Sequence, residues 1–157
     1  MSTPRGRAIG GVAGASVLSA AMVFIGMWEG ERFTAYPDGG NVWTICTGHT
    51  KGVFKGMKAT QAQCDAFLTE DLQEHSQGMR ACATRPFKPD VEVAMLSLTF
   101  NIGVKAFCNS SALRRHNAGD DAAACELIKL WVKDDGRIVR GLVNRREAES
   151  TLCKAPQ

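Results

Sequence analysis

The sequence predicts an α+β fold that is mostly helical, with one small antiparallel sheet near the N-terminus. Strand and turn signals are concentrated in residues 29–46, where FTAY, a PDGGN turn and the β-branched run VWTIC follow one another. Apolar residues recur at helical spacing after Thr60, and residues 91–102 are apolar almost throughout. The 157 residues suffice for one domain with a sizeable core.

The helices are predicted in order along the chain. Thr60 opens the first helix after the sheet, and RPFKPD at residues 85–90 interrupts the chain before a buried central helix at 91–102. Residues 109–111 can cap a helix that Ala118, Gly119 and Asp120 end. A helix over 121–132 and a last helix over 141–153, with a mixed-charge outer face, complete the fold.

Composition and charge exclude several classes of function. The net charge of +3 suits an anionic partner such as a bacterial wall but is too small to indicate nucleic-acid binding. We therefore expect no nucleic-acid partner. We also expect no cofactor and a monomer.

Six cysteines occur, and no CxxC motif is among them: Cys46, Cys64, Cys82, Cys108, Cys125 and Cys153. Their spacing does not match zinc-ligand pairs, so we expect no metal site. They are either free thiols of a cytosolic protein or disulfides of an exported one. In an exported protein Cys82–Cys108, which flanks the central helix, is the favoured pair, and Cys46–Cys64 and Cys125–Cys153 follow by elimination.

The N-terminus favours export. Residues 8–28 contain no charge, follow Arg5 and Arg7, and precede Glu29 and Glu31, a pattern that predicts a membrane segment with the body outside. Eleven of these 21 residues are Ala, Gly or Ser, so the predicted anchor is weak. Two alternatives remain: a signal peptide cleaved after Ser19-Ala20-Ala21, and an ordinary buried helix.

Two carboxylates and a hydroxyl follow this segment. Glu29, Asp38 and Thr44 lie close to a predicted helix end and on the small sheet. Hydrolysis of a glycosidic bond needs one protonated carboxyl to donate to the leaving oxygen, and one ionised carboxylate to stabilise the cation or orient water. Most single carboxylates are solvated surface groups, and Glu31 is expected to be one.

The chain resembles phage-type lysozymes, glycoside hydrolase family 24. The E-x8-D-x5-T spacing of Glu29, Asp38 and Thr44 is kept, with Gly48-His49 after it. TFNIG at 99–103, Trp131 and GLVNRRE at 141–147 match later parts of the family in the same order. The resemblance covers roughly residues 22–153 and implies a lysozyme-like fold with a helical C-terminal lobe.

Residue roles follow from the resemblance. Glu29 is expected to be the general acid, Asp38 the carboxylate that stabilises positive charge and helps to position water, and Thr44 the group that holds this water. Arg145 matches an arginine that pairs with the catalytic glutamate, with Arg146 as the alternative. A further pair, His49 with Asp71, is expected to be structural.

The resemblance implies a muramidase that cuts peptidoglycan as an endolysin. Its apolar N-terminus resembles a signal-arrest-release segment of lambdoid phage endolysins, with residues 1–28 as anchor and 29–157 as catalytic domain. The enzyme would stay in the host inner membrane through residues 8–28, with its body in the periplasm, until a holin or pinholin depolarises the membrane. Residues 22–28 are expected to belong to both anchor and enzyme. Alternatives are an exported lysozyme with a cleaved signal peptide, a non-catalytic wall-binding module and a lytic transglycosylase.

Overall fold

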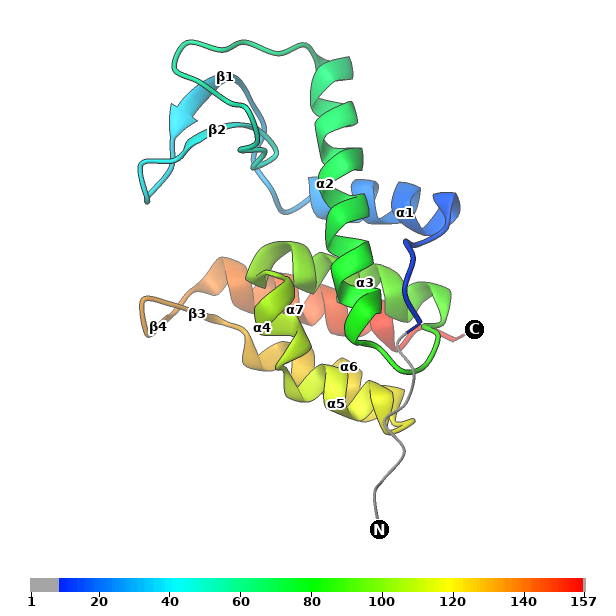
Figure 1. Ribbon diagram of the computed structural model, residues 1–157. Coiled ribbons are helices and arrows are strands. Elements are labelled where there is room, and N and C mark those ends of the chain that lie inside the picture. Colours follow the sequence, from blue (N-terminus) through cyan, green and yellow to red (C-terminus); the bar gives the residue numbers. More distant parts are fainter. Residues whose placement is uncertain (1–8, 157) are drawn as a thin grey trace.

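A long helix, α2 (Gln61–Cys82), connects a small sheet at one end of the molecule to a helical lobe at the other (Figure 1). The computed structural model describes residues 9–156. The helix begins where the sequence predicts: Thr60 is its N-cap, and the Thr60 and Gln63 side chains each accept from the other's backbone N–H.

The small lobe is built on two antiparallel strands, β1 (Arg32–Pro37) and β2 (Trp43–Cys46). Tyr36 pairs with Thr44, and an irregularity in register lies between Arg32 and Tyr36. Ile45 is fully buried. Together with Cys46 and Cys64 it forms a small hydrophobic core that is separate from the core of the helical lobe. The disulfide Cys46–Cys64 fixes the end of β2 to the first turn of α2, so the sheet cannot move freely from the long helix.

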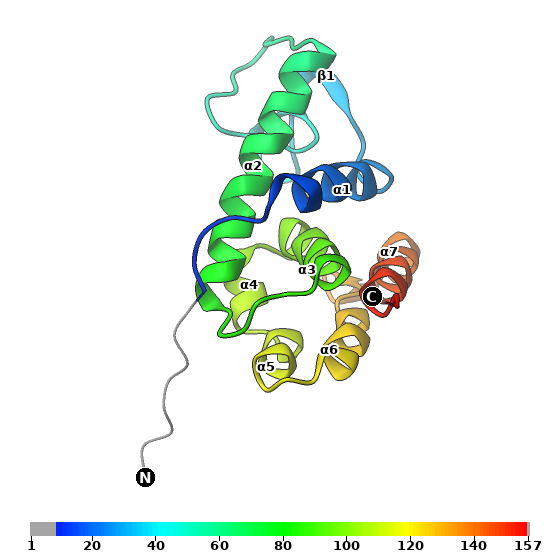
Figure 2. The ribbon, with the colours of Figure 1, turned by 90° about the vertical axis from the view of Figure 1, so that its right-hand side faces the viewer.

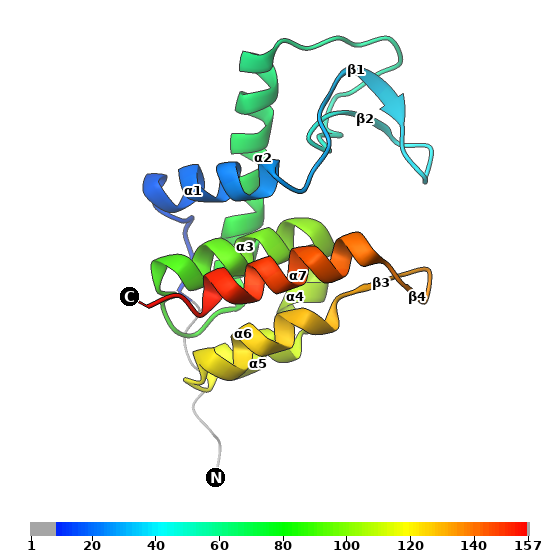
Figure 3. The same cartoon turned by 180° about the vertical axis from the view of Figure 1, so that it is seen from behind.

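The helical lobe is organised around α3 (Pro89–Ile102), which has Pro89 in its first turn. Every residue from Val91 to Thr99 is buried. The last helix, α7 (Arg140–Cys153), lies beside α3 (Figures 2 and 3). The other helices of this lobe are α4 (Val104–Cys108), α5 (Ser111–Asn117), α6 (Asp121–Leu127) and the 3-10 turn η1 (Ile128–Leu130).

One prediction for this lobe is wrong in detail, and the last helix has buried charges that the sequence does not predict. The helix expected over 121–132 ends as an α-helix at Leu127, and a short hairpin of β3 (Lys133–Asp134) and β4 (Arg137–Ile138) follows η1. The last helix does not carry all its charges outward, because Arg145, Arg146 and Glu149 are buried. Their place in the core brings them to the candidate site.

The first helix, α1 (Ala15–Gly26), packs across α2 and α3 (Figures 1 and 2). Its buried residues are Val17, Leu18, Ala21 and Ile25, and Ala13 ahead of it is also buried. The part of the N-terminal segment that packs in the core therefore begins well before residue 22, whereas Met27, within the part expected to pack there, is 65% exposed.

Residues 9–14 lie along the end of α2 that enters the helical lobe. The Ile9 N–H donates to the Ala83 carbonyl, and the Gly10 carbonyl accepts from Arg80 Nε at 3.1 Å. The Ala13 N–H donates to Ser76 Oγ at 2.6 Å. Within residues 9–156, no helix has both the length and the apolarity that a membrane crossing needs. Arg5, Arg7 and the first residue of the predicted anchor lie outside the described residues.

Three disulfides join the six cysteines: Cys46–Cys64, Cys82–Cys108 and Cys125–Cys153. These are the pairs expected for an exported protein. Cys82–Cys108 connects the end of α2 to α4, and Cys125–Cys153 connects α6 to the end of α7. The two bridges within the helical lobe therefore tie its outer helices to its long ones.

Candidate active site

Glu29 follows directly on the end of α1. The last turn continues past Gly26, because the Trp28 and Glu29 N–H groups both donate to the Ile25 carbonyl, at 2.9 and 3.0 Å. Ile25 is fully buried, so it anchors this turn and with it the position of Glu29. The Glu29 side chain is 27% exposed, and its Oε1 lies 2.5 Å from Arg145 Nη1. Arg145, not Arg146, is the residue that contacts Glu29.

Glu29 lines a cleft of about 380 Å³. Its other walls come from the loop after β2, from α2 and from the end of α3: Thr47, Gly48, Thr50, Lys51, Asp71, Glu74, His75, Phe100 and Asn101. The lining is largely polar and charged, which suits a hydrated, hydrogen-bonding substrate such as a saccharide. Residues of both lobes therefore form the walls of this cleft.

Asp38 and Thr44 do not line this cleft, but they are connected through Val42. Asp38 Oδ1 accepts from the Gly40 and Val42 N–H groups at 2.9 and 2.8 Å, which fixes the turn between β1 and β2. Thr44 Oγ1 donates to the Val42 carbonyl at 3.0 Å. These bonds leave Asp38 Oδ2 and the lone pairs of the Thr44 hydroxyl as acceptors.

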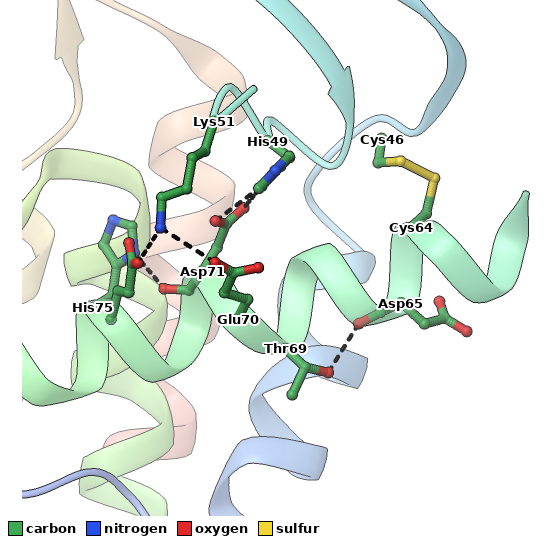
Figure 4. A network of polar contacts seen from close by, with 10 residues as sticks. Cys46, His49, Lys51, Cys64, Asp65, Thr69, Glu70, Asp71 and His75 are labelled. Carbon is green, nitrogen blue, oxygen red and sulfur yellow. Dashed lines mark hydrogen bonds and ion pairs between the residues drawn. A yellow bond between two sulfur atoms is a disulfide. The ribbon is translucent and has the colours of Figure 1, made fainter. Parts of the chain in front are cut away.

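His49 and Asp71 form the expected pair. His49 Nδ1 lies 2.9 Å from Asp71 Oδ2 (Figure 4). The His49 ring also stacks on Phe67, with centroids 4.2 Å apart. His49 is buried, so its contacts connect the end of the sheet to the middle of α2. His49 thus lies between the sheet and α2, as expected of a support, whereas Asp71 also lines the cleft.

Lys51 makes a second connection between the sheet and α2. Its ammonium group contacts Glu70 at 3.2 Å and also contacts Glu74 (Figure 4). The hydrogen bond that Lys51 donates to Glu74 lowers the pKa of Glu74, and the bonds that Lys51 donates to Glu74 and Glu70 raise the pKa of Lys51. The sequence alone gave no reason to single out these three exposed residues.

A buried cluster of charge lies behind Glu29. Arg145 Nε is 3.1 Å from Glu149 Oε1, and Arg146 Nη1 is 2.9 Å from Glu149 Oε2. Ser97 Oγ donates to Glu149 Oε1 at 2.6 Å. Burial raises the pKa of Glu149, although both arginines and Ser97 oppose this, and burial lowers the pKa of Arg146 to about 10. Sequence reasoning missed Glu149, because a charge on a terminal helix ordinarily faces solvent.

Comparison with known proteins shows what the chain as a whole is similar to. The phage lysozyme family model matches residues 26–149. The SAR-endolysin of Enterobacteria phage P21 is 35% identical over 149 residues, which cover 93% of this chain and 90% of that protein. The chain thus matches the relative over almost the whole length of both.

Two solved structures agree with this match. The muramidase domain of SpmX from Asticaccaulis excentricus superposes with a TM-score of 0.82 at 30% identity, over 87% of this chain and 96% of that one. A mutant of P22 lysozyme superposes with a TM-score of 0.77 at 35% identity, over 87% and 97%. The predicted fold, mostly helical with a small sheet and a helical C-terminal lobe, is confirmed by these neighbours.

Proposed function

The chain belongs to the phage lysozyme family, and we propose that it is an endolysin that hydrolyses the β-1,4 bond between N-acetylmuramic acid and N-acetylglucosamine in peptidoglycan. One observation carries this proposal: the Glu29 carboxyl lines the cleft between the two lobes, and Arg145 contacts its Oε1 atom. Within residues 9–156, no group forms a hydrogen bond with Glu29 Oε2. This oxygen is therefore available to deliver a proton. Proton donation to the leaving glycosidic oxygen is the role of a general acid.

Asp38 and Thr44 complete the proposed chemistry. A water molecule that attacks the sugar must give up one proton to a base, while its other hydrogen stays on the new hydroxyl group and can meanwhile donate a hydrogen bond to a second acceptor. Asp38 Oδ2 and the Thr44 hydroxyl are both acceptors, because Asp38 Oδ1 and the Thr44 proton are already used on the backbone around Val42. We assign Asp38 to stabilising positive charge on the sugar and orienting this water, and Thr44 to holding it.

The alternative functions give different products. A lytic transglycosylase would leave 1,6-anhydro ends on the muramic acid, whereas hydrolysis leaves reducing ends. A wall-binding module would leave the polymer intact. The test is to incubate the purified protein with chloroform-treated Gram-negative cells, follow the loss of turbidity, and analyse the released fragments. Reducing ends without anhydro sugars would support the muramidase.

We also propose that residues 8–28 hold the enzyme inactive in the host inner membrane, with its body in the periplasm, until depolarisation by a holin or pinholin. The support is physical: α1 buries Val17, Leu18 and Ile25 in the enzyme body, and Glu29 follows its last turn. The same side chains cannot lie in lipid and in that core together. While α1 is in the membrane, Glu29 would therefore lack its proper position.

Fractionation tests this localisation against a cleaved signal peptide. Cells that express the full chain are fractionated before and after an uncoupler, and the N-terminus of the released protein is sequenced. We expect an uncleaved N-terminus that moves from the membrane to the periplasmic fraction. A new N-terminus after Ala21 would instead support the exported lysozyme with a cleaved signal.

A further inference from the structure

A buried chain of polar groups connects two residues that line the same cleft. The first contact joins Glu29, in the cleft, to Arg145, and the second joins Arg145 to Glu149. Arg145 and Glu149 are each less than 5% exposed. From Glu149 it continues to Arg146, whose Nη2 donates to Asn101 Oδ1 at 2.5 Å. Asn101 lines the cleft together with Glu29. Two separated points of the cleft wall are thus joined through Glu149.

We propose that Glu149 is a positioning residue for hydrolysis, which shares Arg145 with Glu29 and so sets how firmly Arg145 holds the Glu29 carboxyl. This inference rests on the proposed function, in which Glu29 donates the proton. Glu149 is fully buried and acts only through the arginines.

The contacts of Arg145 support this role. Its Nε faces Glu149 at 3.1 Å, and its Nη2 donates to the carbonyl and hydroxyl oxygens of Ser97 at 3.2 and 3.3 Å. Because the guanidinium is planar, these bonds fix its orientation, and Nη1 is the nitrogen that remains to meet Glu29. Ser97 Oγ also donates to Glu149, so the plane is set by two partners that are themselves joined.

The charge count of the cluster gives the direction of the effect. Two carboxyls, Glu29 and Glu149, face two guanidiniums, Arg145 and Arg146. Without the charge of Glu149, Arg145 would keep Glu29 as its carboxylate partner, and no buried carboxylate would balance the charges of the two guanidiniums. Both positive charges would then favour the ionised form of Glu29 more strongly, Arg145 by direct contact and Arg146 from a greater distance. The alkaline side of the enzyme's pH profile, where the proposed general acid stops working, would then move to lower pH.

Other charged groups around Glu29 would stay unchanged. The titratable residues that line the cleft beside it are Lys51, Asp71, Glu74 and His75, and Glu31 and Asp65 lie on its other side. Helix α1 has no charged residue, and in α3 the two acids, Asp90 and Glu92, lie in the first turn. A shift in the pH profile can therefore be assigned to Glu149.

The test is the pH dependence of kcat and KM of the full-length enzyme on purified peptidoglycan, with rates normalised to folded protein. In Glu149→Gln we expect the alkaline loss of kcat to move to lower pH by about one unit, with KM unchanged. Glu149→Asp keeps the negative charge, so its pH profile should lie close to that of the wild type. Glu147→Gln is the matched control: it lies on the same helix, is 58% exposed and pairs with Lys129, and it should behave as wild type.

The outcomes separate the two proposals. A folded Glu149→Gln enzyme with the wild-type pH profile would overturn the positioning role. If Glu149→Gln does not fold, Ser97→Ala decides, because it removes the 2.6 Å bond that stabilises the Glu149 charge. It also removes the 3.3 Å bond from Arg145 Nη2 to the Ser97 hydroxyl, but the bond from the same nitrogen to the Ser97 carbonyl stays. A smaller shift in the same direction supports the role, and no shift rejects it. An inactive wild-type enzyme would reject the proposed function itself, and the positioning role with it.

Discussion

Arg145 Nη1 lies 2.5 Å from Glu29 Oε1 and so joins residues 116 positions apart in the sequence. The contact connects the last helix of the chain to the turn that follows the first one. Because Arg145 is also held by Ser97 and Glu149, Glu29 is attached to a rigid part of the core. The position of the proposed acid therefore depends on both ends of the chain folding together.

Glu29→Gln tests the proposed acid. The amide has nearly the same shape and can still contact Arg145, but it cannot donate a proton to the leaving oxygen. We expect muramidase activity to fall by about 10²–10⁴-fold, with little change in the melting temperature. Turbidity loss of chloroform-treated cells measures the activity, and circular dichroism measures the melting temperature.

Glu31→Gln is the control for this prediction. Glu31 is exposed and accepts one hydrogen bond, from Gln61 Nε2 at 3.1 Å. We expect it to keep close to full activity. If both variants lose activity equally, the assignment of the acid to Glu29 fails.

The elements that the sequence predicted well are those with strong local signals. Thr60 caps α2 with Gln63, and the apolar run of residues 91–102 forms the buried α3. The β3–β4 hairpin was missed, although Asp135 and Gly136, both with positive φ, are a typical two-residue turn. Its strands of two residues each are too short to give a periodic signal.

The candidate site was only partly predictable. The spacing of Glu29, Asp38 and Thr44 is local and can be read from the sequence. Glu149 could not be found in this way, since the pattern of α7 does not reveal that its charged side packs on α3. The extent of α1 was also underestimated, because a weakly apolar, uncharged segment can be read equally well as an anchor or as a core helix.

The Cys46–Cys64 disulfide is expected to stabilise the small lobe. Its loop spans 18 residues, and closing such a loop contributes on the order of 3 kcal/mol. Replacing both cysteines with serine should therefore lower the free energy of unfolding by roughly 2–4 kcal/mol. Urea unfolding of the double variant, compared with wild type under oxidising and reducing conditions, measures this loss. An unchanged midpoint would show that the sheet is held without the bridge.

The contact of Lys51 with Glu74 predicts a pH effect on stability. Lys51 lowers the folded-state pKa of Glu74 below its ordinary value of 4.5. The contribution is therefore fully present above about pH 4.5 and is lost as the pH falls through the lowered folded-state pKa. We expect Glu74→Gln to lower the melting temperature slightly at pH 7 and to have no effect at pH 2. A deficit of equal size at both pH values would contradict the ion pair as its cause.

Deletions test how much of the N-terminus belongs to the enzyme. Removing residues 1–18 would take away the buried side chains of Ala13, Val17 and Leu18, and each of the larger two is worth roughly 1.5–3 kcal/mol. We therefore expect the 19–157 and 29–157 fragments to be unstable and inactive, and the 9–157 fragment to keep its fold and activity. Each is expressed behind a cleavable export signal so that its disulfides form. A fully active 29–157 fragment would refute the shared role of α1.

Gly10 and Gly11 test the balance between membrane and enzyme. Both have positive φ, at +52° and +72°, where a side chain costs roughly 1–2 kcal/mol per residue. Leucine at both positions should also favour membrane insertion. We therefore expect Gly10→Leu with Gly11→Leu to keep more protein in the membrane after an uncoupler and to lower the melting temperature of the released protein.

The matched control is Gly14→Leu with Ala20→Leu, which also adds two leucines, both at exposed positions. Gly14 has a φ of −63°, and Ala20 lies within α1, so neither position has a positive φ. This control should increase membrane retention but leave the melting temperature close to wild type. Equal melting temperatures for the two double variants would show that the conformation of residues 10 and 11 does not contribute to the released enzyme.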